Sequence, residues 1–340
     1  MFPPYYANAD SIIKKIIRRI WETVTLADEY AGWIIPATLK GVSLLRKNQI
    51  NKILVTGPPF SQFIIGYILS KIFGKKLVVD YQDPWYFYLS VNGFKENSMR
   101  YKFNFWLEKK ILSRADKIVF NTNLVKKEYC KVFSFIKDIN KKSFVIENAF
   151  FPANSLEPNF LEKNRRVILY AGNFYGQRKI NYLFKPLLEL EEKGLIKADS
   201  FMIHIFGKIA DDDKECIVKF GLQNYVIEHS KISEREILKY MKGADILYLP
   251  QGDDVKYSVP YKFFDYIRVK KPILAVTSPK SATAEIVNEV GCGEVADISD
   301  SDSVFNALYN ILKGDKEYSF NAEKYTWQNI TLKYKYILNN

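Results

Sequence analysis

The chain has 340 residues, of which 48% are hydrophobic and 15% are aromatic. This content is enough for two buried cores and excludes a generally disordered chain. Lys and Arg outnumber Asp and Glu by 50 to 38, which gives a net charge of +12. The excess indicates an anionic partner such as phosphate, an acidic membrane surface or nucleic acid; the alternative is a solvated basic surface.

The small numbers of cysteine and histidine residues argue against a disulfide framework and against a structural zinc site. Cys130, Cys216 and Cys292 lie far apart and form no Cys-x-x-Cys pair, which fits a reducing compartment rather than a disulfide framework. Two histidines, His204 and His229, are too few for an ordinary zinc site, so we expect no metal. We expect no secretory signal and no membrane span, because no apolar run reaches about 18 residues.

The first periodic segment, residues 11–22, carries isoleucine pairs that alternate with Lys and Arg pairs. On a helix this spacing produces one apolar face, which ends in Trp21, and one basic face. Such a helix can lie in the headgroup layer of an anionic membrane. It can equally dock on its own domain, and the sequence leaves both possibilities open.

From residue 52 onward, short apolar strands alternate with helical stretches, which is typical of parallel sheets covered on both faces. We predict two Rossmann-like α/β domains, residues 1–155 and 156–317, with residues 149–165 as a linker. The first unit of the N-terminal domain looks shortened, and a final helix at 318–338, within 318–340, packs back toward that domain. The predicted strands are 53–56, 77–80, 117–121, 143–147, 167–171, 201–206, 225–228, 244–249 and 272–276.

Candidate binding residues follow two strands of the second domain. Gly172 ends one strand and permits a close backbone approach, and Arg178 and Lys179 follow within a short loop. Pro250 ends another strand.

The segment after Pro250 predicts a helix start. Ser258 is a credible N-cap and Pro260 suits the first turn, so the free amides there favour an anion. Lys262 and Asp265 are three apart and share one helix face, where a cation and a carboxylate can grip a nucleotide. The alternative is an ordinary ion pair on a surface helix.

These motifs, in this order, resemble the donor domain of GT-B glycosyltransferases of family 4, also called group 1. The resemblance implies that Lys179 contacts the donor diphosphate and that Asp265 holds the ribose hydroxyls. Asn173 stands where the family has an arginine, so Arg178 is expected to compensate, and Tyr257 stands where the family has the glutamate that holds the sugar. The implied donor-binding residues are Gly172, Asn173, Pro250, Tyr257, Ser258, Lys262 and Asp265.

Two motifs of the first domain are similar to a subgroup of the same family. Thr-Gly-Pro-Pro-x-Ser begins at Thr56, and Asp80 opens an Asp-x-x-Asp-Pro-Trp segment in which Gln82 replaces the usual arginine. The second carboxylate, Asp83, is the candidate for contact with the acceptor hydroxyl, or else a turn residue before proline. The expected acceptor-side residues are Gly57, Pro58 and Asn121.

The resemblance implies transfer of a sugar from a UDP-, GDP- or ADP-linked donor to a lipid-linked or saccharide acceptor, with retention and without cofactor or metal. Lys179, Arg178 and Lys262 would stabilise the leaving diphosphate. The expected setting is surface polysaccharide synthesis, in the cytoplasm at the inner face of the plasma membrane. The alternatives are a nucleotide-sugar epimerase or phosphorylase on the same fold and an inactive partner subunit. No nucleic-acid partner is expected, because no recognised binding motif occurs.

Overall fold

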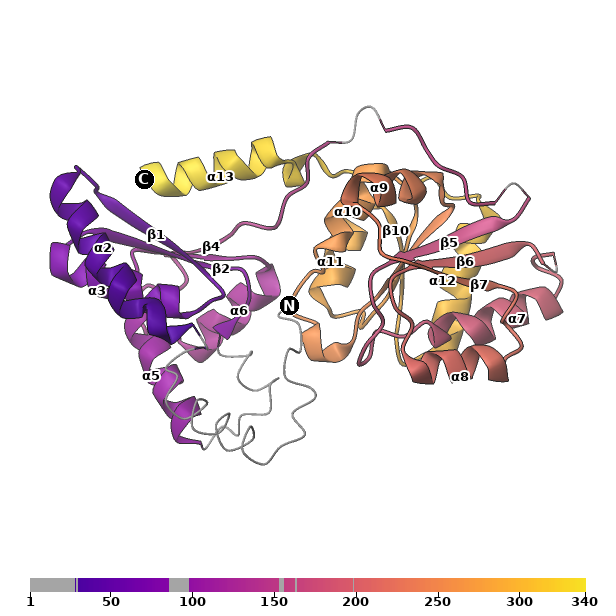
Figure 1. The fold of residues 1–340 in the computed structure, drawn as a ribbon, viewed down its shortest axis with the longest axis horizontal. Helices are drawn as coiled ribbons and strands as arrows, with labels where there is room; N and C mark the ends of the chain where they lie inside the picture. The colour runs from indigo at the N-terminus through magenta and orange to yellow at the C-terminus, as the bar shows by residue number, and fades with distance from the viewer. Residues whose placement is uncertain (1–27, 29, 86–97, 153–155, 163, 198) are drawn as a thin grey trace. The chain divides into compact units, whose positions relative to one another are not determined.

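The computed structural model describes residues 28, 30–85, 98–152, 156–162, 164–197 and 199–340. The predicted amphipathic segment 11–22 lies outside them. Two compact units make up the chain (Figure 1), one comprising Met1–Ile146 with Tyr336–Asn340 and the other Glu147–Lys335. No helix in the described ranges is both long and apolar enough to cross a bilayer.

Unit 1 is built on four parallel strands in the order β1-β2-β3-β4. The central strands are continuous apolar runs because a parallel sheet is covered on both faces. In register, Thr56 of β1 lies beside Asp80 of β2, which brings their polar side chains together at one end of the sheet. The strands are β1 (Lys52–Gly57), β2 (Lys76–Tyr81), β3 (Lys117–Phe120) and β4 (Ser143–Val145).

Local signals in the sequence set the ends of the unit 1 helices. The Ser98 side chain caps α5 by accepting from the Tyr101 amide at 3.2 Å, and Thr122 caps α6 in the same way. Gly74 ends α3 in the left-handed conformation that glycine adopts without strain. The helices are η1 (Ala31–Trp33), α2 (Ile34–Lys47), α3 (Ser61–Phe73), α5 (Met99–Arg114) and α6 (Asn123–Val132).

The end of the chain completes unit 1. The backbone carbonyl of Ile337, near the end of α13, accepts a hydrogen bond from the Lys117 ammonium at 3.1 Å, and Lys52 donates to the carbonyl of Leu338. Both lysines begin strands of the unit 1 sheet. They therefore satisfy carbonyls that the end of a helix leaves without a partner and complement its negative end.

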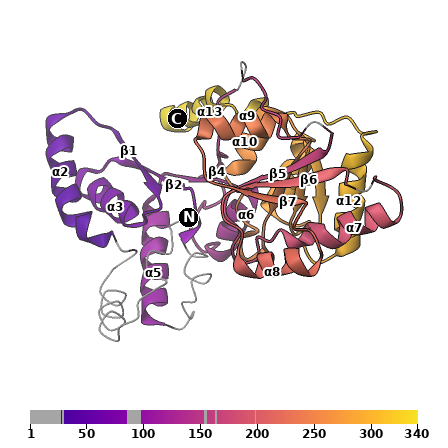
Figure 2. The ribbon, with the colours of Figure 1, turned by 45° about the vertical axis from the view of Figure 1, so that its right-hand side comes forward.

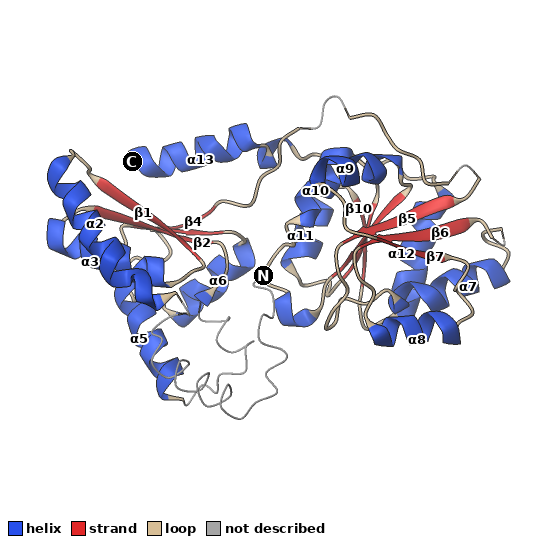
Figure 3. Ribbon diagram, in the orientation of Figure 1, coloured by secondary structure: helices blue, strands red, loops and turns tan. Residues whose placement is uncertain are grey.

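Unit 2 is built on six parallel strands in the order β10-β9-β8-β5-β6-β7 (Figure 3). The chain first adds β6 and β7 on one side of β5 and then adds β8, β9 and β10 on the other. The strand order therefore reverses between β5 and β8. These strands are β5 (Arg166–Ala171), β6 (Phe201–Phe206), β7 (Val226–His229), β8 (Ile246–Pro250), β9 (Ile273–Val276) and β10 (Gly293–Ala296).

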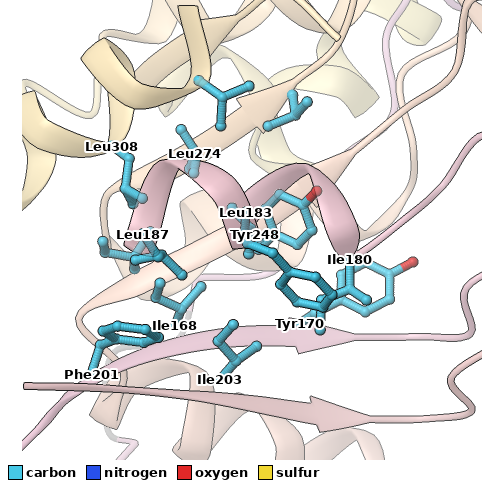
Figure 4. Packing of buried hydrophobic residues seen from close by; sticks show 14 of the residues in the cluster. Ile168, Tyr170, Ile180, Leu183, Leu187, Phe201, Ile203, Tyr248, Leu274 and Leu308 are labelled. Atoms are coloured by element: carbon cyan, nitrogen blue, oxygen red, sulfur yellow. The ribbon is translucent and has the colours of Figure 1, made fainter. Parts of the chain in front are cut away.

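Helices cover both faces of this sheet, and side chains alternate between two cores along each strand. Ile168 and Tyr170 of β5 enter one core, whereas Val167 and Leu169 enter the other. Figure 4 shows Tyr170 packed among aliphatic side chains in the first core, near Tyr248 of β8. The helices are η2 (Asn181–Leu183), α7 (Phe184–Glu192), α8 (Asp211–Lys219), α9 (Glu234–Gly243), η3 (Asp253–Val255), α10 (Lys262–Val269), α11 (Ala282–Val290), α12 (Ser301–Lys313), η4 (Glu323–Tyr325) and α13 (Trp327–Asn339).

The predicted fold class, α/β with two parallel-sheet domains, is confirmed. The prediction of one helix over 318–338 is wrong in its first part, because α13 begins only at Trp327. The amides of Ser319 and Asn321 bond to the carbonyls of Gly291 and Val290 at the end of α11, which holds that segment out of a helix. The sequence analysis also missed α2 and the short edge strand β10.

Candidate functional site

The candidate site of unit 2 lies where the strand order reverses. Strands β5 and β8 end at Ala171 and Pro250, and their loops lie at the same edge of the sheet. Open α/β sheets bind ligands at the carboxyl ends of their strands at such a switch point. The predicted donor-binding residues all belong to these two loops or to the helix that follows the second loop.

Tyr266 anchors α10 to both strands. Its hydroxyl accepts a hydrogen bond from the Ala171 amide at 3.3 Å and donates one to the Tyr248 carbonyl at 3.1 Å. This places the first residue of α10, Lys262, beside the end of β5, since residues four apart lie on the same helix face. The packing of α10 therefore positions Lys262 at the switch point.

Lys262 points into the end of β5. Its ammonium nitrogen lies 3.9 Å from the centroid of the Tyr170 ring, within the range of a cation–π contact. A Cβ atom on Gly172 would lie 2.6 Å from that nitrogen, so a larger residue at 172 would require the ammonium to shift. Gly172 also has a φ of +142°, a conformation that other residues rarely adopt. Both the backbone conformation and the close approach of the ammonium therefore favour glycine at 172.

The Lys262 ammonium is a poorly compensated charge. Burial, followed by the nearby charge of Arg178, lowers the pKa of Lys262 to about 7. No carboxylate in the described ranges forms an ion pair with it, and in particular Asp265 does not. The alternative interpretation of an ordinary Lys–Asp pair on a surface helix is therefore wrong. Two cations that approach each other in a partly desolvated place favour an anion between them.

Arg178 and Lys179, which are adjacent in sequence, have different partners. The Arg178 guanidinium stacks on the Tyr175 ring at 4.8 Å from its centroid and donates to the Tyr175 hydroxyl. The Lys179 ammonium instead forms an ion pair with Asp212 at the start of α8, and the hydrogen bond that Lys179 donates to the Asp212 carboxylate raises the pKa of Lys179. The structure thus brings Arg178, rather than Lys179, electrostatically close to Lys262. Contact between Lys179 and a diphosphate stays a prediction and requires Lys179 to leave Asp212.

The Asp265 carboxylate is half-buried and has no hydrogen-bond or ion-pair partner among the residues that the structure describes. Burial raises the pKa of Asp265 to about 6; Glu234 adds to this shift and Arg268 opposes it. Arg268 itself lies 3.4 Å from the Glu234 carboxylate. A carboxylate without a partner, on the helix that carries Lys262, can accept two hydrogen bonds from a diol.

Gln251, which the sequence analysis missed, fixes the loop between β8 and α10. Its side chain is buried, and its amide nitrogen donates to the carbonyls of Val255 and Ser258 at 3.0 and 2.7 Å. Its amide oxygen accepts from the Thr277 hydroxyl at 3.5 Å. A polar residue directly after a buried strand that ends in Pro250 was the available signal.

The prediction that Ser258 caps α10 is wrong. The helix begins at Lys262, and its N-cap residue, Tyr261, makes no side-chain capping bond. The Ser258 carbonyl accepts a hydrogen bond from the Gln251 side chain, and the Ser258 backbone amide donates to the Val255 carbonyl. The chain therefore makes one more turn before the helix starts. The backbone amides of Val259 and Tyr261 have no acceptor within the described part of the chain, which leaves them available to a ligand.

Asn173, at the position of the missing family arginine, has a structural role. Its side-chain oxygen accepts from the Lys208 amide at 3.0 Å, and its carbonyl accepts from the Tyr170 hydroxyl at 3.1 Å. Tyr257, at the position of the missing glutamate, is half-buried, and the Lys256 ammonium lies 5.5 Å from its ring centroid. Neither residue supplies the charge that the family has there.

A second polar group lies at the carboxyl edge of the unit 1 sheet. Asp80 accepts hydrogen bonds from the Thr56 hydroxyl and from the Gln82 side chain, at 3.0 Å to the nearer oxygen. The Asn121 amide donates to the Gln82 carbonyl. Gln82 thus links Asp80 and Asn121 at this edge of the sheet.

Asp83 follows this group and is half-buried, and burial raises its pKa. No hydrogen bond to its carboxylate is formed within the described ranges. Gly57 and Pro58 lie at the end of β1, where the Gly57 carbonyl accepts from the Gln82 amide at 2.9 Å. A Cβ atom on Gly57 would lie 2.7 Å from the Phe63 ring, so glycine permits the close packing of this turn.

The two histidines form a separate pair on β6 and β7, with Nδ1 of His204 2.9 Å from Nε2 of His229. Burial lowers the pKa of both imidazoles. Across the described ranges, no three His, Cys, Asp or Glu side chains gather as metal ligands would. The three cysteines are free.

No protein-family model matches the sequence, and no curated protein matches it in sequence. Solved structures do match. HepE of Anabaena, solved in complex with UDP, superposes with a TM-score of 0.66 over 97% of this chain and 90% of its own, at 12% identity. Sucrose-phosphate synthase of Thermosynechococcus elongatus superposes with a TM-score of 0.64 over 91% and 78%, at 14% identity. UDP-GlcNAc 2-epimerase of Methanocaldococcus jannaschii gives 0.53 over 91% and 82%, at 12% identity. These likenesses show that the chain has the two-domain GT-B fold.

Proposed function

We propose that the protein is a glycosyltransferase that takes a sugar from a nucleotide-sugar donor. The single observation that carries the proposal is the Lys262 ammonium, held at the switch point of the unit 2 sheet without an acidic partner within the described residues and next to the charge of Arg178. A diphosphate supplies the anion that this arrangement favours. HepE, which has the same fold, was solved with UDP.

The rest of unit 2 fits a nucleoside diphosphate. The amides of Val259 and Tyr261 add donors beside Lys262, and the Asp265 carboxylate on the same helix can accept both ribose hydroxyls. Gly172 and Pro250 lie where the two loops begin, at the ends of β5 and β8. Lys179 contacts the diphosphate once its ammonium leaves Asp212. The nucleotide base and the sugar stay open among UDP, GDP and ADP donors.

Transfer consists of breaking the bond between the anomeric carbon and the diphosphate oxygen. The bond electrons leave with the diphosphate, and the acceptor hydroxyl attacks the same face of the sugar, which retains the anomeric configuration. The acceptor proton passes to the leaving phosphate. Lys262, Arg178 and Lys179 stabilise the charge that develops on the diphosphate, a contribution of about 100- to 1000-fold in rate for a single well-placed donor. No resident metal or cofactor forms part of the proposal.

The acceptor belongs to unit 1. The Asp83 carboxylate, whose pKa burial raises, is the candidate for contact with the acceptor hydroxyl, and Gly57, Pro58 and Asn121 lie at the same edge of the sheet. The acceptor class we propose is a lipid-linked sugar or a saccharide in surface polysaccharide synthesis. The free cysteines fit a cytoplasmic location, and residues 11–22 would attach the protein to the inner face of the membrane.

One second candidate has an observation in its favour. The epimerase of Methanocaldococcus jannaschii has the same fold, and an epimerase also grips a nucleotide sugar. The two activities differ in their products: a transferase releases nucleoside diphosphate only when an acceptor or water takes the sugar, whereas an epimerase converts a donor into its isomer. A partner subunit without activity would not bind donor at millimolar concentration.

The test is a thermal-shift screen of UDP-, GDP- and ADP-sugars followed by analysis of products, because a bound donor stabilises only the folded state. Lys262→Ala should abolish turnover and weaken donor binding about 100-fold or more, with the fold intact. Lys270→Ala, at the other end of α10, is the matched control and should keep full activity. Unchanged activity in Lys262→Ala would refute the placement of the donor.

A further inference from the structure

One face of α5 carries more apolar surface than the fold uses. Met99, Phe103 and Trp106 are 84%, 38% and 50% exposed, and their spacing of four and three residues places them on one side of the helix. Leu107 and Ile111, on an adjoining side of the helix, are buried in unit 1. In Figures 1 and 2, α5 projects away from the sheet of unit 1. These three side chains therefore form an exposed apolar stripe that does not belong to the core of unit 1.

Lysines that form no ion pair with a described residue surround this stripe. Lys102, Lys109 and Lys110 are exposed, and none of them forms an ion pair in the described ranges. The Lys110 ammonium lies 5.8 Å from the centroid of the Trp106 ring. The one carboxylate of α5, Glu108, is buried and accepts from the Tyr129 hydroxyl at 2.7 Å. The exposed face of α5 is thus apolar and basic, with no acidic side chain.

A second aromatic side chain widens the surface. Phe135, in the turn that follows α6, is 55% exposed, and the Lys109 ammonium lies 4.8 Å from the centroid of its ring. The Phe103 and Trp106 rings lie 5.7 Å apart. We name the set Met99, Phe103, Trp106 and Phe135, with Lys102, Lys109 and Lys110, the α5 surface.

We propose that the α5 surface docks on an anionic lipid bilayer. Met and Phe side chains gain by entering the apolar boundary, and a Trp ring prefers the headgroup level because its indole is both apolar and polar. Lysines can lay their stems on the apolar layer and keep their ammonium groups among lipid phosphates. The charge is complementary, because three lysines that the described residues leave without an ion pair face the negative surface of the membrane.

The inference goes beyond the proposed function and does not depend on it, since docking is measurable without turnover. It also assigns membrane contact to a part of the chain different from residues 11–22. If the α5 surface and residues 11–22 both contact the membrane, their binding energies add. The protein is then bound more tightly than by either weak contact alone.

The experiment uses the full chain and vesicles of phosphatidylcholine with about one third phosphatidylserine or phosphatidylglycerol. Sedimentation measures the partition coefficient of the wild type, of Phe103→Ala with Trp106→Ala, and of Lys102, Lys109 and Lys110 all changed to Glu. A cation near such a surface contributes about fivefold, so removal of three should weaken binding at least about a hundredfold. The matched control changes Lys185, Lys219 and Lys270 of unit 2 to Glu and should bind about as the wild type does.

A second readout tests insertion directly. Brominated lipids should quench part of the tryptophan fluorescence of the wild type, and Trp106→Phe should lose that part. The thermal midpoint and donor binding of every variant are measured to verify the fold. Equal binding of wild type and Phe103→Ala/Trp106→Ala overturns the proposal and assigns membrane contact elsewhere. Binding to neutral vesicles as strong as to anionic ones, or no binding to either, also overturns it.

Discussion

The protonation of Lys262 predicts how donor affinity depends on pH. In the free protein the pKa of Lys262 is about 7, because the site is desolvated and the charge of Arg178 is near. A bound diphosphate favours the charged form and raises the pKa of Lys262 in the complex. Affinity is therefore full below pH 7 and falls as the pH rises above it, since binding then requires uptake of a proton.

The expected size of the effect follows from this linkage. While Lys262 remains charged in the complex, the apparent Kd rises toward tenfold for each pH unit above 7, which amounts to about fiftyfold between pH 7 and pH 9 because half of the lysine is already neutral at pH 7. Asp265 sets the other limit, because its pKa is about 6 and its protonated form loses one acceptor for the ribose. Affinity should thus be greatest between about pH 6 and pH 7.

Calorimetric titration with a nucleotide sugar from pH 5 to pH 9 measures this profile. The intact donor is the right probe, because a free nucleoside diphosphate has a terminal phosphate that itself titrates near pH 6. Lys262→Arg keeps its charge throughout and should flatten the alkaline side, whereas Asp265→Asn should flatten only the acidic side. The bare nucleoside lacks the phosphates and should retain only the acidic dependence.

The reasoning is refuted by a constant Kd between pH 7 and pH 9 in the wild type. It is equally refuted if Lys262→Arg shows the same alkaline loss as the wild type, because the titrating group would then lie elsewhere.

Three further substitutions have definite expected outcomes. Gln251→Ala removes the donor to two buried carbonyls, so the donor KM should rise and stability should fall by about 1–3 kcal/mol, as measured by steady-state kinetics and urea unfolding. Gly207→Ala should unfold unit 2 or lower its thermal midpoint, because the new Cβ would lie 2.1 Å from the Gly172 carbonyl oxygen at a φ of +153°; a normal midpoint would contradict the packing of these two loops. Asp212→Ala frees Lys179 and should tighten donor binding in calorimetry, whereas the same change at Asp211, beside it on α8, should have no effect. Weaker binding in Asp212→Ala would show that the ion pair serves the fold and not the donor.

The sequence predicts the strands well because each central strand is a continuous apolar run, such as residues 167–171, between polar turns. It also places Lys262 and Asp265 on one helix, because their spacing depends only on local geometry. It could not predict the partner of Lys179, since Asp212 lies 33 residues away and meets it only after α8 has packed. Nor could it predict the burial that lowers the pKa of Lys262, because neighbours such as Tyr170 of β5 are distant from it in the sequence.

The helix boundaries failed where tertiary contacts replaced local signals. Ser258 and Pro260 have the residue types of a helix start, but the Gln251 side chain holds the Ser258 carbonyl and delays α10 to Lys262. Residues 319–321 have amides that bond to the end of α11, and no local pattern reveals that contact.

The bonds from Lys52 and Lys117 to the end of α13 have a consequence for the order in which the protein folds. Residues 336–340 are made after all of unit 2, yet they supply the carbonyls that receive these ammonium groups. Until they arrive on a growing chain, Lys52 and Lys117 lack these acceptors at neighbouring strand starts; in the folded chain burial lowers the pKa of Lys117, and the charges of Lys52 and Lys76 add to that shift. The domain that is synthesised first is therefore completed last.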